Sequence, residues 1–369
     1  MSFRLRPYLR CCVNVQSMTG RPGCVRVRVS TKEPLPTAQF WIAVKENYDL
    51  GMLRTHVART LESHYDTVLY EDGGPTLTGY QRARSEAMTT PMADESMARW
   101  VQSIDATYEL VRNPAIRAKY PVLAEKVASA LEACESALHD YGVNGCALSF
   151  NGGKDCTVLA HILCAALRKF LNVQKDHKLL PPIRSLYVAC KDPFPEVEAF
   201  ISYASSQRTG YNLQLQTAHG ALSSALGTYI NGKAGEGVQA MFIGIRHDDP
   251  HGSSLQVRSP CDPSWPPIMR VHPILDWNYT DIWSFLRCPV LCANEREVVP
   301  PCVAGQDVGV PYCILYDYGY TSLGNRFNTI PNPELLDIST NSYKPAYRLC
   351  DGAKERFGRL PNSTSPQTS

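Results

Sequence analysis

Apolar positions in the second part of the chain fall into short runs that alternate with stripes at helical spacing. The runs predict strands over residues 146–150, 183–189, 211–216 and 239–245. The stripes predict helices over residues 158–170, 196–206, 219–230 and 279–287. Strands that alternate with helices at this spacing are typical of an α/β fold, with a mainly parallel twisted sheet flanked by helices. Ligands of such folds bind at the carboxyl ends of the strands.

Two further helices are expected ahead of the first strand. From Asp94 on, apolar side chains between Trp100 and Val111 recur at helical spacing. Pro114 ends that helix, because the residue before a proline is disfavoured in the helical conformation. The next helix begins near Pro121, since proline suits the first helical turn.

The N-terminal 32 residues carry several arginines and no acidic side chain, which is the composition of a mitochondrial transit peptide. Two features oppose that interpretation: Pro7 interrupts an early helix, and Val25–Val29 alternates like a strand. A mitochondrial location is therefore expected, with a plain basic extension on a cytoplasmic protein as the alternative. Residues 33–93 are an extension of unknown role, which ends in a linker poor in apolar residues.

Composition excludes several classes of protein. The 37 basic and 35 acidic residues leave a formal net charge of +2, which disfavours a general binder of nucleic acid. No run of about 18 apolar residues is present, so we expect no membrane-spanning helix. The 14 cysteines have no Cys-x-x-Cys spacing and follow no secretory signal, which favours reduced thiols.

The segment from Ser149 to Asp155, SFNGGKD, joins the first predicted strand to a helix and has the features of a phosphate loop. Gly152 and Gly153 let the backbone come close to a ligand. The following helix offers unpaired N–H groups and the positive end of its dipole, which together bind anions. Ser149 adds a hydroxyl and Lys154 a positive charge. A carboxylate such as Asp155 repels bound phosphates unless a cation lies between them, and Mg²⁺ bridges carboxylates to phosphate oxygens.

The spacing of this loop is not G-x-x-x-x-G-K-[ST], so the common NTPase P-loop is excluded. A plain strand-to-helix turn is the alternative. The loop resembles the pyrophosphate loop of the adenine-nucleotide α-hydrolase superfamily. That superfamily includes phosphoadenylylsulfate reductases and tRNA-thiolating enzymes, and it cleaves ATP between the α and β phosphates.

Three later segments carry further candidate chemistry. Residues 244–250, GIRHDDP, follow a predicted strand and therefore lie at its carboxyl end, although Asp-Pro also builds turns. Residues 265–277 hold aromatic side chains that suit a flat ring system, although such side chains are more often core. The third segment, residues 310–359, is rich in hydroxyls and glycines, which suits a loop that closes on a ligand. At its end, Arg356 and Arg359 are spaced to point at one anion, the alternative being a solvated face.

Together these segments, with SLYxxxxDPFPEVExFI at 185–201 and GYTSLG at 319–324, resemble the eukaryotic FAD synthases, which are FMN adenylyltransferases. The resemblance runs from about residue 121 to 360. It implies a phosphoadenylylsulfate-reductase-like α/β domain, which we bound at residues 94–360. It also implies that Asn151 and Asp155 belong to the ATP and Mg²⁺ site, that Arg246 and Asp249 lie at the flavin and phosphate site, and that the two arginines close over the substrates.

The residues and the resemblance together define the expected site. The expected catalytic residues are Asn151, Asp155, Asp249 and Arg356, and the expected Mg²⁺ ligands are Asp155 and Asn151. The residues expected to bind ATP or its phosphates are Ser149, Phe150, Gly152, Gly153, Lys154 and Arg359. The residues expected to bind flavin are Gly244, Arg246, Trp265 and Trp277.

The chain departs from the family pattern between residues 290 and 309, which read as an insertion. Cysteines lie within and beside it, at 288, 292, 302 and 313, but without the short pairs usual in zinc sites, so a plain surface loop is expected. Residues 1–120 lie outside the resemblance, and residues 361–369 form a tail.

The expected reaction joins AMP from ATP to FMN and gives FAD and pyrophosphate. No nucleic-acid or membrane partner is expected, and transient delivery of FAD to apoflavoproteins is a further hypothesis. A phosphoadenylylsulfate reductase is disfavoured because Cys350 stands in Leu-Cys-Asp-Gly instead of a Glu-Cys-Gly-x-His context. The near-neutral charge disfavours a tRNA-modifying enzyme, and a flavin carrier without catalysis remains as the alternative of a different class.

Overall fold

The structure is a computed structural model. It describes residues 2–5, 9–17, 24–31, 38–43, 68–70 and 91–360, except 208, 293–299 and 306, with side chains from residue 97 on. It divides the chain into two compact units, Met1–Ala93 and Asp94–Ser369. Each unit is treated by itself below.

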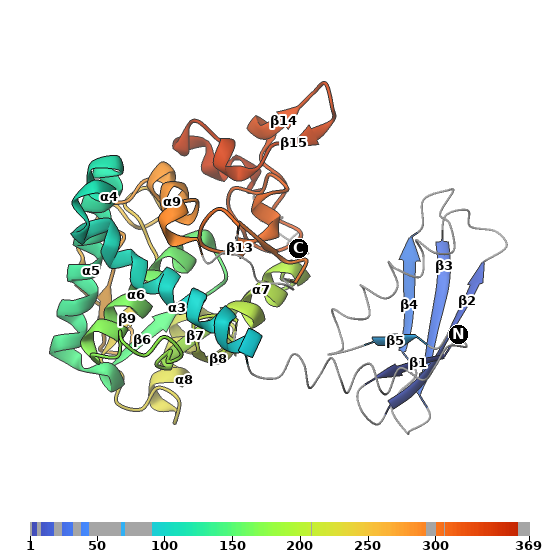
Figure 1. The fold of residues 1–369 in the computed structure, drawn as a ribbon, viewed down its shortest axis with the longest axis horizontal. Coiled ribbons are helices and arrows are strands. Elements are labelled where there is room, and N and C mark those ends of the chain that lie inside the picture. The colour runs from blue at the N-terminus through green and yellow to red at the C-terminus, as the bar shows by residue number, and fades with distance from the viewer. Residues whose placement is uncertain are drawn as a thin grey trace, which may run out of the picture. The chain divides into compact units, whose positions relative to one another are not determined.

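The N-terminal unit contains an antiparallel sheet. Its strands are β1 (Ser2–Leu5), β2 (Leu9–Ser17), β3 (Cys24–Thr31), β4 (Ala38–Ala43) and β5 (Val68–Tyr70). They lie in the order β4-β3-β2-β1-β5, as Figure 1 shows in blue. The alternating segment Val25–Val29 lies within β3, where Val27 faces Val15 of β2 across the ladder. The acid-free segment thus forms three strands, and the mitochondrial location stays a prediction.

The second unit is built on a six-stranded sheet. Its strands are β6 (Cys146–Ser149), β7 (Ile183–Ala189), β8 (Leu213–His219), β9 (Ala240–Phe242), β10 (Arg258–Pro260) and β11 (Met269–Val271). The order is β10-β11-β9-β6-β7-β8. All neighbouring strands pair in parallel except β10, which runs antiparallel to β11. The predicted α/β fold with a mainly parallel sheet is confirmed.

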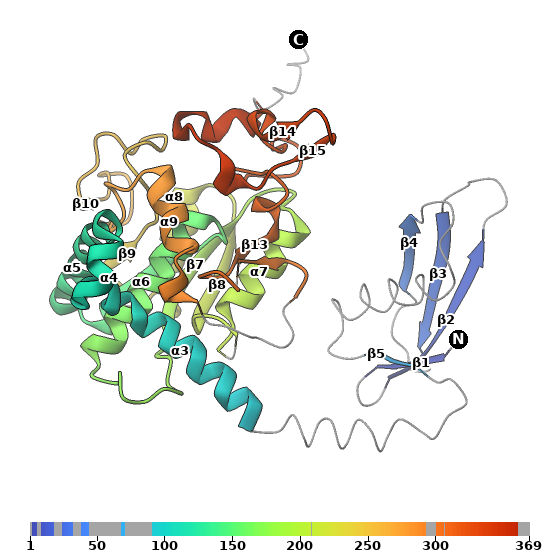
Figure 2. The ribbon, with the colours of Figure 1, turned by 45° about the horizontal axis from the view of Figure 1, so that its top comes forward.

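Helices cover both faces of this sheet (Figures 1 and 2). They are α3 (Pro91–Arg112), α4 (Pro114–Lys119), α5 (Pro121–Tyr141), α6 (Lys154–Phe170), α7 (Pro195–Ser205), α8 (Leu222–Asn231) and α9 (Tyr279–Leu286). Because strand side chains alternate between faces, Leu148 packs in the large core with α5, α6, α7 and α9, whereas Ala147 packs with Leu226 of α8.

The Asn113-Pro114 pair does more than end α3. The Asn113 Oδ1 accepts hydrogen bonds from the backbone N–H groups of Ala115, at 3.0 Å, and Ile116, at 3.3 Å. It thereby caps the short helix α4, whose first residue is Pro114. Asparagine is a favourable N-cap and proline a favourable first helical residue, so this pair starts a helix that the sequence analysis did not expect.

The expected insertion at 290–309 is not simply a surface loop. Its described end contains β12 (Val303–Ala304), which pairs antiparallel with β13 (Tyr312–Cys313). Cys302, Val303 and Ala304 are buried in the large core. Across the described residues, no group of three or more histidine, cysteine or acidic side chains could hold a metal ion, so the structure gives the zinc hypothesis no support.

After β13 the chain continues through short 3₁₀ turns and a small hairpin (orange to red in Figure 2). These elements are η3 (Ile314–Tyr316), η4 (Pro333–Leu335), β14 (Leu336–Asp337), β15 (Ser342–Tyr343), η5 (Ala346–Arg348) and η6 (Gly352–Gly358). Tyr316 of η3 and Glu355 of η6 both reach the start of α6. No helix in the described part of the chain combines the length and the apolar character needed to cross a membrane.

Candidate functional site

The candidate site lies where the order of the strands reverses. The chain passes from β6 to β7 and β8 on one side, and later places β9 and β11 on the other side of β6. Ligands of doubly wound sheets bind at such a switch point, beyond the carboxyl ends of the strands. The SFNGGKD segment connects β6 to α6 there, so the predicted phosphate loop occupies the ligand position of the fold.

Glycine at position 152 is dictated by the geometry of this loop. Its φ is +71°, and a Cβ there would lie 2.7 Å from Cγ1 of Ile201 in α7. The Asn151 Oδ1 accepts hydrogen bonds from the Gly153 N–H, at 3.0 Å, and from the Cys156 thiol, at 2.9 Å. Asn151 therefore fixes the turn, because both acceptor positions of its oxygen are used within the loop.

The N-cap residue of α6, Gly153, has no side chain that could cap the helix. The Lys154 backbone N–H donates to the Tyr316 hydroxyl at 2.8 Å, so η3 is held against the first turn. A Cβ on Gly244 would lie 2.9 Å from the backbone nitrogen of Cys156, so the end of β9 packs closely on the same turn. The N–H groups of this turn that donate to no side chain lie at the positive end of the helix and form an anion site. The close packing explains why residue 244 is a glycine, and its contact with flavin stays a prediction.

The Lys154 side chain points inward. It is 2% exposed, and its Nζ lies 2.9 Å from Asp155 Oδ2 and 2.5 Å from Glu355 Oε1. Burial lowers the pKa of this ammonium, but the Asp155 and Glu355 carboxylates outweigh burial and raise the pKa above its ordinary value. Lys154 therefore stays charged as a buried counterion beneath the loop, not extended toward a phosphate as the sequence analysis expects.

Arg246, which follows β9, joins three carboxylates and is 1% exposed. Its Nε lies 2.8 Å from Asp155 Oδ1, and its Nη2 lies 3.1 Å from Asp249 Oδ1 and 2.7 Å from Glu355 Oε2. Its Nη1 has no hydrogen-bond partner among the described residues. A buried charge is tolerated only when it is paired. We therefore treat five side chains as one unit and call it the buried charge cluster: Lys154, Asp155, Arg246, Asp249 and Glu355.

Three carboxylates against two cations leave the buried charge cluster with an excess of negative charge. Burial raises the pKa of Asp155, but Lys154 and Arg246 outweigh it and hold that pKa below its ordinary value. For Asp249, burial raises the pKa, and repulsion from Asp155 adds to it against the lowering by Arg246. Opposite shifts of two neighbouring carboxyls are a feature of functional sites.

The two C-terminal arginines lie near each other at the outside of the site. Arg356 is exposed, whereas Arg359 is half-buried and donates from Nη1 to Leu323 O at 2.7 Å and to Ser322 Oγ at 3.4 Å. Burial and the neighbouring Arg356 guanidinium lower the pKa of Arg359. Neither arginine has a carboxylate partner among the described salt bridges, so an anion between them would relieve their mutual repulsion.

Among Ser149 and the three aromatic side chains expected at the ligands, two are buried in the core and two are half-buried. Phe150 is fully buried in the core. Trp277 is 3% exposed and packs with its ring centroid 5.8 Å from that of Phe285, which leaves no face for a flavin ring. Trp265 is half-buried and packs on the core beneath α8. Ser149, at the end of β6, is half-buried and remains at the loop.

Glu355 and Tyr316 belong to the site but could not be identified from the sequence pattern. Each lies inside a segment that had been singled out, and Glu355 directly precedes Arg356. Glutamate is almost never buried unless it is paired, so no local pattern marks Glu355 as the residue that turns inward. The hydroxyl-rich character of the segment around Tyr316 was the available signal.

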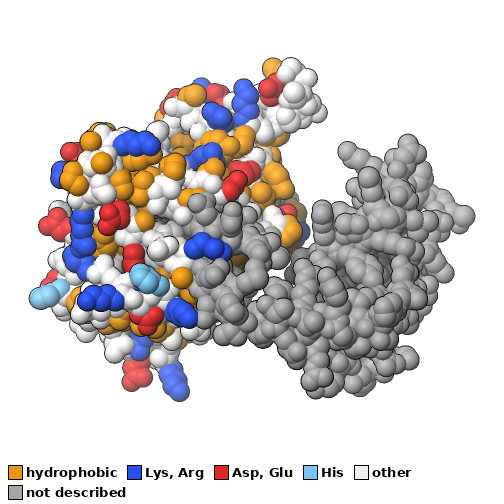
Figure 3. Space-filling model, viewed as in Figure 1, with side chains coloured by type: hydrophobic (Ala, Val, Ile, Leu, Met, Phe, Trp, Pro, Cys, Tyr) orange, Lys and Arg blue, Asp and Glu red, His pale blue; other side chains and the backbone are white. Residues whose placement is uncertain are grey.

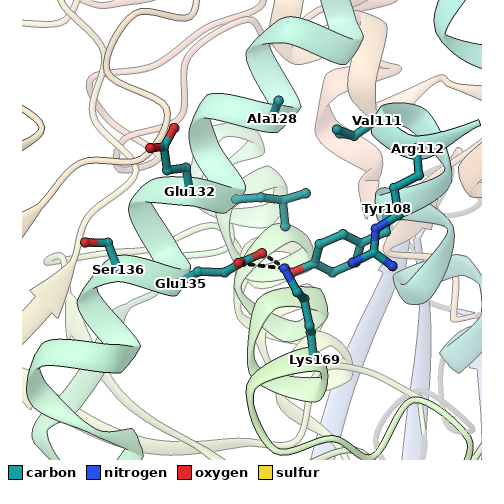
Figure 4. Close-up of a pocket in the computed structure, with 9 residues that line it drawn as sticks. Tyr108, Val111, Arg112, Ala128, Glu132, Glu135, Ser136 and Lys169 are labelled. Carbon is teal, nitrogen blue, oxygen red and sulfur yellow. Dashed lines mark hydrogen bonds and ion pairs between the residues drawn. The ribbon is translucent and has the colours of Figure 1, made fainter.

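A surface hollow of ≈ 360 Å³ lies elsewhere, lined by side chains of α3, α5 and α6 (Figure 4). Lys169 borders it near the end of α6, about 22 Å from Lys154 at 1.5 Å per helical residue. Glu135 accepts hydrogen bonds there from the Tyr108 hydroxyl at 2.5 Å and from Lys169 at 2.7 Å. Glu135 and Lys169 thus pair with each other, and the hollow is separate from the candidate site.

The sequence profile described as the phosphoadenosine phosphosulfate reductase domain matches residues 145–295. A probable FAD synthase of Schizosaccharomyces pombe is 34% identical over 270 residues, which is 72% of this chain and 91% of that protein. A probable FAD synthase of Caenorhabditis elegans is 36% identical over 239 residues, but the match spans 40% of that longer protein.

A solved structure agrees with these relatives. The Candida glabrata FMN adenylyltransferase in complex with FAD and inorganic pyrophosphate has a TM-score of 0.55 and 25% sequence identity. The match covers 72% of this chain and 97% of that one. The resemblance found in the sequence motifs is confirmed, and with it the enzyme class of nucleotidyltransferases. This chain belongs to the FAD synthase family.

Proposed function

We propose that this chain transfers AMP from ATP to FMN at the carboxyl ends of β6 and β9. The observation that carries the proposal is the N-terminus of α6 at the switch point of the sheet, where the SFNGGKD loop ends in an N-cap glycine without a capping side chain. Membership of the FAD synthase family supplies the two substrates. Charged side chains of both signs are interspersed over the face seen in Figure 3, which does not favour a nucleic-acid substrate.

The reaction exchanges one phosphoric anhydride bond for another. An oxygen of the FMN phosphate forms a bond to the α-phosphorus of ATP, and the bond from that phosphorus to the bridging oxygen of the β-phosphate breaks. Pyrophosphate leaves with the bonding electron pair. The second pKa of a phosphate monoester is near 6, so the attacking oxygen is largely ionised at neutral pH and needs no general base.

The protein supplies positioning and compensation of charge. The backbone N–H groups in the first turn of α6 that donate to no side chain would hold the departing pyrophosphate. Arg356 and Arg359 would hold the two reacting phosphates together against their repulsion. The buried charge cluster fixes the loop, the turn after β9 and η6 as one unit, so these groups keep their alignment.

Mg²⁺ fits this site if the substrate phosphates supply most of its ligands. Mg²⁺ is usually held by one or two carboxylates plus phosphate oxygens. The Asp155 and Asp249 side chains are 18% and 22% exposed and belong to a cluster with excess negative charge. Asn151 fits less well, because its Oδ1 already accepts two hydrogen bonds. When bound, the ion would neutralise charge on the phosphates.

The mitochondrial location and direct delivery of FAD to apoflavoproteins stay predictions of a different kind. The first depends on the acid-free N-terminal segment. Fractionation of cells that express the full chain would test the location. Transfer of FAD to an apoflavoprotein in the presence of excess free FAD-binding competitor would test delivery.

The proposed function is tested by pyrophosphate release with ATP, Mg²⁺ and FMN, with riboflavin and adenosine phosphosulfate as control substrates. We expect release that depends on FMN and falls about 100-fold or more in Asp155→Ala, the magnitude typical of losing one electrostatic group of an active site. The matched control is Asp140→Ala, which removes an aspartate that pairs with Arg258 at 2.6 Å on the surface. Binding of FMN without pyrophosphate release would exclude catalysis and favour a flavin carrier.

A further inference from the structure

Glu355 holds a buried carboxylate between cations from two distant segments. Its residue exposure is 7%. Oε1 lies 2.5 Å from Lys154 Nζ at the start of α6, and Oε2 lies 2.7 Å from Arg246 Nη2 after β9. One side chain of η6 thus contacts both strand ends that form the candidate site.

The backbone around Glu355 is fixed as well. The Thr321 hydroxyl donates to the Glu355 carbonyl oxygen at 2.5 Å. Asn332 Nδ2 donates to Thr321 Oγ1 and to the Lys354 carbonyl oxygen, both at 2.9 Å. Thr321 and Asn332 are themselves buried, so η6 has little freedom to turn. This scaffold directs the carboxylate toward Lys154 and Arg246, beyond the carboxyl ends of the central strands β6 and β9.

The position of Glu355 in the chain connects this scaffold to the arginines. Arg356 follows it directly, and Arg359 lies one turn further on. We propose that Glu355 is a positioning residue for adenylyl transfer, which locks η6 to the phosphate loop and so sets where Arg356 and Arg359 meet the substrate phosphates. This inference rests on the proposed function, which supplies those phosphates.

Charge explains why glutamate is required there. Without the Glu355 carboxylate, Lys154 keeps only Asp155, and Arg246 Nη2 keeps only Asp249. The Lys154 ammonium and the Arg246 guanidinium would then have only Asp155 and Asp249 as carboxylate partners, and these are the aspartates that the proposed function places at the substrate phosphates. Misplacing a reacting group by about 1 Å can cost about 100-fold in rate. The effect of Glu355 thus passes through groups that touch the substrate.

The test compares Glu355→Gln with Glu355→Asp in the full chain. Glutamine keeps the volume and removes the charge, whereas aspartate keeps the charge. We expect kcat for pyrophosphate release to fall about 100-fold in Glu355→Gln, with a smaller change in the KM for ATP, and to recover in part in Glu355→Asp. The matched control is Glu334→Gln. Glu334 of η4 pairs at 2.8 Å with Lys354, which precedes Glu355 in η6, but the Glu334 side chain is 38% exposed.

A double-mutant cycle with Arg356→Ala separates positioning from mere stability. If Glu355 acts through the arginines, its loss costs much less in the Arg356→Ala background than in the wild type. Independent, multiplicative losses of kcat, or a Glu355→Gln variant with lower thermal stability but unchanged kcat per folded molecule, would overturn the inference. If Glu355→Gln does not fold, the same cycle is measured with Glu355→Asp and with Thr321→Val. Thr321→Val removes the hydrogen bond to the Glu355 carbonyl and so loosens η6 without a change of charge.

The wild-type rate and the variant ratios answer different questions. Absence of FMN-dependent release by the wild type would refute the proposed function. The affinity for ATP, measured by calorimetry for the wild type, Glu355→Gln and Glu334→Gln, would still test the inference. We expect about 10-fold weaker binding in Glu355→Gln alone, and equal affinities would contradict it.

Discussion

At the residue scale, Gly152 connects backbone geometry to catalysis most directly. We expect Gly152→Ala to lower the free energy of unfolding by about 1–2 kcal/mol, the cost of left-handed backbone for a residue with a Cβ. The rate of pyrophosphate release should fall as well, because the new Cβ would lie 2.7 Å from Ile201 Cγ1 and displace the loop. Chemical unfolding and the rate assay measure the two effects.

Gly142→Ala is the matched control for this prediction. Gly142 has a φ of +66°, close to the +71° of Gly152, but a Cβ there would meet no atom within 4 Å. It ends α5, away from the loop. We expect a similar loss of stability and an unchanged rate. Equal rates for both variants would mean that the loop tolerates displacement.

His272 supplies a prediction about pH. It is 1% exposed and its Nδ1 lies 2.8 Å from the Gln256 carbonyl oxygen. Burial lowers its pKa, and the nearby Arg270 adds to this against the raising effect of the Gln256 contact. As pH falls below the ordinary value of about 6.5, the unfolded chain takes up a proton that the folded chain does not. Stability from this group is therefore present above that pH and lost below it.

We expect His272→Gln to reduce the fall in thermal stability between pH 7.5 and pH 5.5. Glutamine can keep a donor toward the Gln256 carbonyl but does not titrate, so the difference between variant and wild type isolates this histidine. Thermal unfolding of both chains at several pH values in this window measures it. Identical slopes for the two proteins would show that His272 does not contribute.

The sequence also located part of the site at the residue scale. The loop from Ser149 to Asp155 could be found because a strand, two glycines and a helix stand in immediate succession. The inward direction of Lys154 and Glu355 could not be found, because each depends on a partner far away in sequence, Glu355 for Lys154 and Arg246 for Glu355. The role of Trp277 could not be assigned either, since an aromatic residue gives the same sequence pattern in a core and at a ligand site. The catalytic roles stay predictions.

At the scale of elements, the accuracy of prediction followed the length of the hydrophobic pattern. The strand expected at 183–189 has those bounds, and the helix expected at 279–287 is α9, Tyr279–Leu286. Three-residue strands such as β10, with the sequence RSP, are too short to show a period, and they form because a neighbouring strand offers hydrogen bonds. The helix expected from residue 158 begins at Lys154, since polar residues in a first turn hide its start.

Helix α9 gives a prediction at this scale. The Asn278 side chain accepts from the Asp281 N–H and the Asp281 carboxylate accepts from the Asn278 N–H, both at 2.9 Å. We expect Asn278→Ala to lower the free energy of unfolding by about 1 kcal/mol, the usual effect of losing an N-cap. Asn278→Ser keeps an acceptor and serves as the control. Denaturant unfolding checks both, and equal losses would mean that the cap contributes nothing.

At the scale of the whole molecule, all side chains of the candidate site lie in the unit Asp94–Ser369. That unit has its own core, which extends from Trp100 to Leu349. The match to the Schizosaccharomyces pombe protein spans 270 residues, which is shorter than this chain by about the length of the N-terminal unit. The match is therefore about as long as the second unit.

We accordingly expect a chain that begins at Pro91, the first residue of α3, to keep the rate of FMN-dependent pyrophosphate release within about twofold, because a domain with its own core folds independently. The full chain is measured beside it under the same conditions, and circular dichroism of both reports whether the shortened chain folds. A shortened chain that folds but loses the reaction would show that residues before Pro91 act in substrate binding. A shortened chain that fails to fold would show that the first unit stabilises the second. Retained activity would confine the function of the N-terminal sheet to events outside the chemical step.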